Sequence, residues 1–454
     1  MSTQVSHQAA TRTTVLLCAA AFMTMLDLFI VNVALVSIGA TYPGSSLADL
    51  SWVLNAYIVV YSALLVPAGA LADRYGRKQA FLAGLALFTV ASLGCAVAPG
   101  LWALVGFRAV QAVGAAALTP ASLGLILSVL PETRRPGAVR IWATTSSFAG
   151  AFGPVIGGLL ADVSWRWAFL LNLPIGMVAF VLAARLLPAS AQATTARMPD
   201  PVGAAAIAVT VGAVSLGLVM AGAWETGPLL LVAGLALAAL GLLVHRVRTH
   251  AAPVLPRRLF RVPSFSIANL TILVFTSAFG AVFLSVSLWM QTTAGYGPFR
   301  AGLALLPGPL MVPLFAALTQ RRAGGAQPRY VIATGLVVFG AGSLLLAIRG
   351  GGQYAVDVLP AWLIIGAGIG IAMPTLIASA TSDLSPGDAA TGSGVVNTAR
   401  QTGYALGIAG LVAILGDQVG GGFAAGWVFV TALVLISAAT ALFIRQTSTR
   451  TVTQ

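Results

Sequence analysis

The sequence has very few charged residues. Only 8% of its 454 residues are Asp, Glu, Lys or Arg, whereas about a quarter of the residues in an ordinary soluble domain are charged. Hydrophobic residues make up 58% of the chain. This composition excludes a sizeable soluble domain. We expect an all-α polytopic membrane protein, because helices satisfy their own backbone groups inside a lipid bilayer.

Residue types that bind metals or carry out catalysis are also scarce. The chain has two cysteines, Cys18 and Cys95, and its three histidines are scattered. Both cysteines lie inside apolar runs, where a small core residue is more common than a disulfide or a metal site. The acidic residues form neither a catalytic cluster nor a ring of charges for an ion filter. We therefore expect no enzyme, no metal and no cofactor, and a channel is disfavoured.

Long apolar runs fill most of the chain. Each is long enough to cross about 30 Å of hydrocarbon as a helix. The runs predict fourteen transmembrane helices, at about residues 15–38, 51–71, 79–98, 102–129, 138–161, 167–187, 202–223, 227–246, 265–290, 299–319, 330–348, 355–380, 391–415 and 423–444. Long connections bracket the seventh and eighth of them. This predicts a six-helix half over residues 1–187, an inserted helix pair with its flanking loops over 188–264, and a second six-helix half over 265–454.

Basic residues collect on one side of the expected bundle. With the N-terminus in the cytoplasm, only Arg166, Arg300 and Arg349 face the outside. This bias predicts a multi-pass protein of the cell membrane, with both termini inside the cell. We expect this membrane to be the cytoplasmic membrane of a bacterium. The net charge of +13 is then a topology signal, and no nucleic-acid partner is expected.

One carboxylate, Asp27, lies deep inside an expected helix. A charge at the centre of a bilayer costs about 2.5 to 3.5 kcal/mol on insertion scales, so it is seldom kept for structure alone. Every other acidic residue can be assigned to a membrane edge. Arg108 lies in the same half of the membrane by helical rise, and is a possible partner. Asn32, five residues after Asp27, falls on a different face and is interpreted as a helix-packing hydrogen bonder.

A tight turn joins the second and third expected helices, with the sequence G-A-L-A-D-R-Y-G-R-K over residues 69–78. Positive charges at the inner membrane surface would explain its arginines but not the acid Asp73 beside them. The turn resembles the loop signature of the major facilitator superfamily, G-x-L-a-D-R-x-G-R-k. In that family Asp73 would lie near the N-terminal end of the helix expected at 391–415, where the helix dipole favours a negative charge. The resemblance implies a conformational latch formed by Gly69, Asp73, Arg74, Gly76 and Arg77.

The helix expected at 138–161 carries a run of small residues. Glycines let neighbouring helices approach closely, and a proline permits a kink. Ordinary packing would account for single glycines, but the set resembles the G-x-x-x-G-P-x-x-G-G signature of antiporters, with its first glycine one residue closer. The matching residues are Gly150, Gly153, Pro154, Gly157 and Gly158.

Two further stretches resemble the fourteen-helix drug:proton antiporters of this superfamily. They are L-D-L-F-I-V-N-V-A-L at residues 26–35 and W-R-W-A-F-L-L-N-L-P-I-G at residues 165–176. The resemblance implies the major facilitator fold, with two six-helix halves around a central cavity and two inserted helices. It implies export of a small lipophilic drug, antibiotic or natural product, driven by the proton gradient and performed by a monomer. An exporter of one endogenous metabolite and a proton-coupled importer stay as alternatives.

We expect Asp27 and Arg108 to pair and to carry proton coupling. Burial favours the protonated form of Asp27, whereas a nearby arginine favours the ionised form, so rearrangement between states could load and release a proton. A static buried ion pair is the alternative.

Polar and aromatic residues on three expected helices are candidates for the substrate cavity. Arg400 either hydrogen-bonds carbonyls of a broken helix or contacts an anionic or carbonyl-rich substrate. Tyr57 and Tyr61 could stack on a flat ligand or simply pack. Gln111 shares the helix face of Arg108. The expected lining residues are Tyr57, Tyr61, Gln111, Asn397, Arg400, Gln401 and Tyr404.

Overall fold

The computed structural model describes residues 7–130, 133–188, 200–221, 224–322, 326–350, 352–384, 388–416 and 422–444, and within them it contains helices and no strand. Each expected apolar run corresponds to one helix or to two helices in line. The long connection expected before residue 200 lies mostly outside the described residues. The helices are α1 (His7–Thr41), α2 (Leu47–Tyr75), α3 (Arg77–Ala96), α4 (Leu101–Val129), α5 (Arg135–Val163), α6 (Trp167–Leu170), α7 (Asn172–Leu186), α8 (Pro201–Met220), α9 (Thr226–Thr249), η1 (Leu259–Arg261), α10 (Pro263–Thr292), α11 (Pro298–Leu305), α12 (Pro307–Arg322), α13 (Pro328–Arg349), η2 (Tyr354–Val358), α14 (Leu359–Thr381), α15 (Ala389–Leu415) and α16 (Phe423–Ala441).

Two of the expected helices are each divided in two. α6 and α7 meet at Leu171, and α11 and α12 meet at Leu306. Pro174 and Pro307 lie just after these junctions. Because proline has no N–H to donate to the carbonyl four residues before it, the helical hydrogen-bond ladder is interrupted at both places.

The helices form a polytopic membrane bundle. In the described part of the chain, 12 helices are long and apolar enough to cross a bilayer. α5 and α15 pack alongside them at the two remaining expected positions. Large apolar side chains face outward, and on α9 Leu231 is 76% exposed and Leu237 70% exposed. Such a surface suits lipid and is rare on a soluble protein.

Two sets of helices pack in the same way, the N-terminal helices α1–α7 and the C-terminal helices α10–α16. A Cβ atom on Gly84 would lie 2.8 Å from the Gly114 carbonyl oxygen between α3 and α4, and one on Gly335 would lie 2.8 Å from the Gly368 carbonyl oxygen between α13 and α14. Only glycine allows these backbones to approach so closely. The repeated contact suits two related halves, although the division at residues 187 and 264 stays a prediction.

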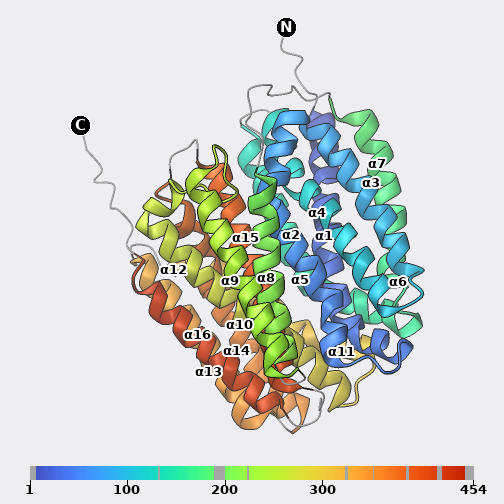
Figure 1. The fold of residues 1–454 in the computed structure, drawn as a ribbon, viewed down its shortest axis with the longest axis vertical. Helices are drawn as coiled ribbons and strands as arrows, with labels where there is room; N and C mark the ends of the chain where they lie inside the picture. Colours follow the sequence, from blue (N-terminus) through green and yellow to red (C-terminus); the bar gives the residue numbers. More distant parts are fainter. Residues whose placement is uncertain are drawn as a thin grey trace.

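The two sets meet along two seams. In the α2–α15 seam the Thr398 hydroxyl donates to the Ser62 carbonyl at 3.2 Å, and α8 packs against both helices (Figure 1). In the α5–α11 seam, towards the lower end of Figure 1, a Cβ atom on Gly158 would collide with the Pro298 carbonyl oxygen. α9 packs on α8. α8, with α9 behind it, therefore covers one seam and leaves the other to α5, α11 and their neighbours.

An ion pair joins one end of α8 to the end of α9. Asp200 accepts hydrogen bonds from the Gly203 backbone N–H at 2.9 Å and from Arg246 Nη2 at 2.8 Å. Burial by itself would raise the pKa of Asp200, but the hydrogen bonds from Arg246 and Gly203 outweigh it and lower the pKa below the ordinary value of 3.8. The ionised carboxylate thus caps α8 and holds α9 beside it.

Asp200→Ala should lower the stability of the purified protein by about 1 kcal/mol from the lost helix cap alone. Because the pKa of Asp200 is lowered in the folded protein, its contribution is present at neutral pH and is lost as the pH falls below about 4. Thermal unfolding in detergent between pH 3 and 7 measures this difference. Glu225→Ala is the control, because Glu225 precedes α9 without a side-chain capping bond. Equal stability of wild type and Asp200→Ala at pH 7 would contradict the expectation.

Candidate functional site

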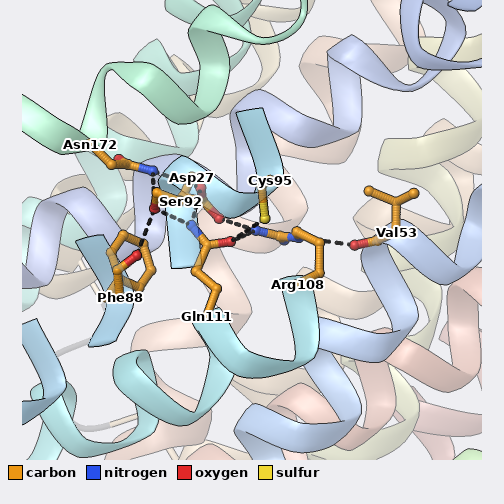
Figure 2. Close-up of polar contacts among 8 residues, drawn as sticks. All are labelled: Asp27, Val53, Phe88, Ser92, Cys95, Arg108, Gln111 and Asn172. Atoms are coloured by element: carbon orange, nitrogen blue, oxygen red, sulfur yellow. Dashed lines mark hydrogen bonds and ion pairs between the residues drawn. The ribbon is translucent and has the colours of Figure 1, made fainter. Parts of the chain in front are cut away.

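Asp27 and Arg108 form an ion pair at the centre of the N-terminal helices (Figure 2). Asp27 lies on α1 and is 1% exposed, and Arg108 lies on α4 and is 0% exposed. Arg108 Nη1 donates to Asp27 Oδ2, and Arg108 Nε donates to the Val53 carbonyl of α2 at 3.0 Å. The pair is therefore sealed from solvent and is attached to three helices.

Aromatic rings cover the guanidinium of Arg108. Its Cζ lies 4.1 Å from the centroid of the Tyr57 ring and 5.8 Å from that of Phe169, which is within the range of cation–π attraction. Tyr57 also stacks on Tyr61, with ring centroids 5.8 Å apart, and both tyrosines are buried. The sequence groups Tyr57 with the substrate cavity. In this conformation the ring instead packs against the ion pair.

Three neutral side chains complete the surroundings of Asp27. Gln111 Nε2 and Asn172 Nδ2 each donate to Asp27 Oδ1 at 3.0 Å. The same nitrogens donate to Ser92 Oγ of α3, at 2.7 Å from Gln111 and 3.3 Å from Asn172. Gln111 Oε1 accepts from Arg108 Nη1 at 2.6 Å. Gln111 thus lies with the ion pair, as the helix face that it shares with Arg108 indicates, and its place in the substrate cavity stays a prediction. We call these five residues the Asp27 site.

Sequence reasoning does not single out Ser92 or Asn172. Asn172 has a signal, because an amide inside an apolar run is uncommon and this one belongs to the W-R-W-A-F-L-L-N-L-P-I-G stretch. Ser92 has none, since serines are ordinary packing residues in membrane helices. Which side chains gather around Asp27 depends on how α7 packs on α1 and how α3 packs on α4 and α7.

A second group of polar side chains lies between the two sets of helices. The Arg400 Nε and Tyr404 hydroxyl of α15 have no hydrogen-bond partner, nor has either polar atom of Asn32 on α1. The Tyr404 hydroxyl lies beside the Asn32 side chain, and Arg400 is within electrostatic reach of Tyr61. We use the name α15 polar cluster for five residues: Asn32 on α1, and Asn397, Arg400, Gln401 and Tyr404 on α15. Asn32 on α1 thus faces Tyr404 on α15, and its role as a helix-packing hydrogen bonder stays a prediction.

Arg400 has no counter-ion in the part of the chain that the structure describes. The aromatic rings next to the cluster are those of Tyr404 and Phe279, whose centroids are 5.9 Å apart. Phe279 packs in turn on Phe283 at 5.8 Å, and Phe283 on Phe29 of α1 at 5.3 Å. The rings of Tyr404, Phe279, Phe283 and Phe29 thus form a row from α15 to α1, and Arg400 lies one helical turn before Tyr404 on α15.

The turn between α2 and α3 makes its described contacts within the N-terminal helices. Gly76 has φ 105°, a value that favours glycine. Asp73 accepts from Arg77 Nε at 2.8 Å, and Arg77 Nη1 donates to the Gly124 carbonyl of α4 at 2.7 Å. Arg74 lies over the Tyr75 ring, and Gly69 packs on Pro120. Among the described contacts, Asp73 pairs with Arg77 and not with the start of α15.

The α5 glycines bring α5 directly onto two neighbouring helices. A Cβ atom on Gly157 would lie 2.8 Å from Ile30 Cα of α1, while Gly150 and Gly153 face the Phe29 side chain. The carbonyl of Pro154 packs against Gly302 of α11. The small-residue run therefore holds α1, which carries Asp27, against the α5–α11 seam.

Comparisons with known proteins agree on one family. Residues 17–408 match the family described as Major Facilitator Superfamily. The methylenomycin A resistance protein of Streptomyces coelicolor is 35% identical, with 87% of this chain and 83% of that protein covered. The cephamycin export protein of Amycolatopsis lactamdurans is 33% identical, with 91% of this chain and 86% of that protein covered. A multidrug resistance protein of Mycobacterium tuberculosis is 30% identical, with 87% of this chain and 74% of that protein covered.

Solved structures share the fold at low sequence identity. A POT family transporter in complex with 5-aminolevulinic acid has a TM-score of 0.72 at 15% identity, covering 94% of this chain and 95% of that one. A bacterial homologue of the human lysosomal transporter Spinster, in an inward-facing conformation, has a TM-score of 0.68 at 15% identity, with 97% of each chain covered. These likenesses establish the arrangement of the helices and nothing about the substrate.

Arg108→Leu should destabilise the protein by about 3–5 kcal/mol, because it leaves the Asp27 carboxylate buried without its cation. Adding Asp27→Asn to the same chain should restore much of that loss. Thermal unfolding of the purified variants in detergent gives the comparison. Arg400→Leu is the matched control, since it removes a cation that has no ion-pair partner. If Arg108→Leu is no less stable than Arg400→Leu, the ion pair does not hold the N-terminal helices together.

Proposed function

The chain belongs to the major facilitator superfamily, and we propose that it exports small lipophilic drugs, antibiotics or natural products across the cell membrane in exchange for protons. It is a transporter and not an enzyme. Relatives named for antibiotic resistance, antibiotic export and multidrug resistance, each at least 30% identical over most of the chain, support this proposal. The observation that carries proton exchange is the Asp27–Arg108 pair, buried at membrane depth.

Asp27 is the proposed proton carrier, and Arg108 its counter-charge. Because the pair lies within the N-terminal helices, tilting the two sets of helices as rigid bodies would leave it unchanged. α1 offers the connection to the other set: its Val33 carbonyl accepts from Gln291 Nε2 of α10 at 3.1 Å, and Phe29 packs on Phe283. Opening this contact would release α1 from the C-terminal helices and change the surroundings of Asp27.

The α15 polar cluster is the proposed substrate site. Arg400 needs an acceptor, and Asp27, the acid at comparable depth, is already occupied by Arg108, Gln111 and Asn172. A substrate with a carboxylate or several carbonyl oxygens would satisfy Arg400, while its apolar part packs on Phe279 and Tyr404. Tyr61, Asn397 and Gln401 border this site. Tyr57 and Gln111 could reach a substrate only after the Asp27 site opens.

The turn with Gly69, Asp73, Arg74, Gly76 and Arg77 is proposed as a latch that stabilises one of the two transport states. Asp73 pairs with Arg77, which also donates to the Gly124 carbonyl of α4, and the α5–α11 seam is closed by Gly158 and Pro298. This combination suits a state that is shut on the outer side. We further propose cytoplasmic termini and a monomeric transporter, in line with the distribution of arginines along the chain.

Asp27→Asn should abolish the exchange of substrate for protons, because an amide cannot take up and release a proton. In proteoliposomes, an imposed pH gradient should drive substrate accumulation by the wild type and not by the variant. Glu225→Gln, which lies outside the Asp27 site, the latch and the α15 polar cluster, is the control and should retain a response to the gradient. Unchanged pH-driven accumulation by Asp27→Asn would refute proton coupling at this residue, and accumulation with the opposite polarity would mean import.

Arg400→Leu should weaken binding of acidic or carbonyl-rich substrates about tenfold or more, since a hydrogen bond to a charged group contributes roughly 1.5 to 3 kcal/mol. Arg400→Lys should retain part of the affinity because it keeps the charge. Binding is measured on purified protein with pairs of compounds that differ only in a free or esterified carboxylate. Equal losses for the acid and its ester would argue against a contact between Arg400 and that group.

A further inference from the structure

We propose that Asn172, together with Ser92, is a positioning residue for the proton-carrying carboxylate. Its amide donates to Asp27 while Asp27 is ionised, and it turns over to accept a hydrogen bond when Asp27 carries a proton. The inference rests on the proposed proton role of Asp27. It adds the protein groups that distinguish the two protonation states of that residue.

The direction of each hydrogen bond around Asp27 follows from its neighbours. Arginine can only donate, so the Gln111 oxygen faces Arg108 and its nitrogen must face Asp27. The Ser92 hydroxyl donates its single proton to the Phe88 carbonyl at 2.8 Å. Ser92 Oγ therefore accepts from both amide nitrogens (Figure 2). Every polar group that contacts the Asp27 carboxylate is a donor.

This arrangement has no place for a proton on Asp27. A carboxylic acid has an O–H group that needs an acceptor, but Oδ1 faces two amide N–H groups and Oδ2 faces the guanidinium. A buried donor without an acceptor is costly, by about 1–3 kcal/mol. At least one neighbour must therefore change its orientation when a proton arrives.

Asn172 is the neighbour that is free to turn. Gln111 is held through both ends of its amide, by Arg108 on one side and by Asp27 and Ser92 on the other. Asn172 is held through its nitrogen, by Asp27 and Ser92. A half-turn of this amide would present its oxygen to both partners. Asp27 would then donate its new proton to Asn172, and the Ser92 hydroxyl would turn from the Phe88 carbonyl to the same oxygen.

The fold places Asn172 where this turn is possible. It is the first residue of α7, directly after the junction with α6 at Leu171, and it is 2% exposed. Because the helix begins there, its side chain projects from a helix start towards α1 and α3 (Figure 2). The Pro174 that interrupts the helix thus also sets the position from which Asn172 reaches Asp27.

Few other groups near Asp27 can titrate or carry charge. Those that face it from the neighbouring described helices are Arg108 on α4, Tyr57 on α2 and Cys95 on α3. α5 meets this part of α1 with Gly153, and α7 with Asn172. Arg108 remains charged in both states, so its presence alone cannot distinguish them. The neutral amide can, because it is able to donate or accept.

The test measures substrate-induced proton release from purified, full-length protein as a function of pH, using a transported compound found by screening. Asn172→Leu removes the amide at nearly constant volume. Losing a donor to the ionised carboxylate should move the pH midpoint upward by about one unit, roughly tenfold in proton affinity. Asn172→Ala should shift it in the same direction and serves if the leucine variant does not fold. Asn269→Leu is the matched control, because Asn269 is also buried and bonds only within its own helix, to the Phe265 carbonyl.

The outcomes separate the inference from the proposed function. An upward shift in the Asn172 variants, with the Asn269→Leu midpoint unchanged, supports the positioning role. Asp27→Asn could abolish proton release while the Asn172 variants keep the wild-type midpoint, even if less proton is released. In that case Asn172 is merely structural, and the inference fails while the proposed function stands. If Asp27→Asn releases protons as the wild type does, proton coupling at Asp27 is refuted, and the role of Asn172 with it.

Discussion

A carboxylate and a guanidinium buried together at membrane depth are the interaction on which the N-terminal helices depend. Removing two charges from water costs several kcal/mol for each ion, and the pair alone seldom recovers this cost. Here the remaining hydrogen bonds come from Val53 of α2, Gln111 of α4 and Asn172 of α7. The helices that supply these groups must stay at one relative height, because a shift of one turn would leave a buried charge unsatisfied.

The C-terminal helices repeat the packing but not the electrostatics. The glycine contact between α3 and α4 recurs between α13 and α14, so close backbone approach supports both sets in the same way. Yet the arginine of α15, Arg400, has no partner comparable to Asp27 among the described residues. One set therefore contains an arginine paired with a carboxylate, and the other an arginine without a counter-ion among the described residues. In the proposed function this difference separates the proton site from the substrate site.

Much of the fold could be predicted from the sequence because the bilayer imposes a single length on every span. Apolar runs located α4 and α13 to within about two residues. The interruptions at Leu171 and Leu306 were missed, since a proline within an apolar run does not reveal whether the helix bends or stops. Membership of the superfamily, expected from the loop and helix motifs, is confirmed by the match over residues 17–408.

The site was only partly predictable. The depth of Asp27 and Arg108 can be counted along each helix, and the two residues were expected to pair. Asn172 reaches this carboxylate from a helix far away in the sequence, Ser92 contacts the amides of Asn172 and Gln111, and both positions follow from packing. The spacing that puts Gln111 on the helix face of Arg108 agrees with their hydrogen bond, while its contact with a substrate stays a prediction.

The position of α8 has a consequence for molecules dissolved in the membrane. α8 lies across the α2–α15 seam, while the inserted pair leaves the α5–α11 seam to other helices. A lipid-soluble compound diffusing sideways in a leaflet would therefore find one flank of the molecule covered and the opposite flank bordered by lipid. α8 and α9 thus make the two lipid-facing flanks of the protein different. A compound that enters sideways from the bilayer towards the α15 polar cluster would have to enter at the flank that contains α5.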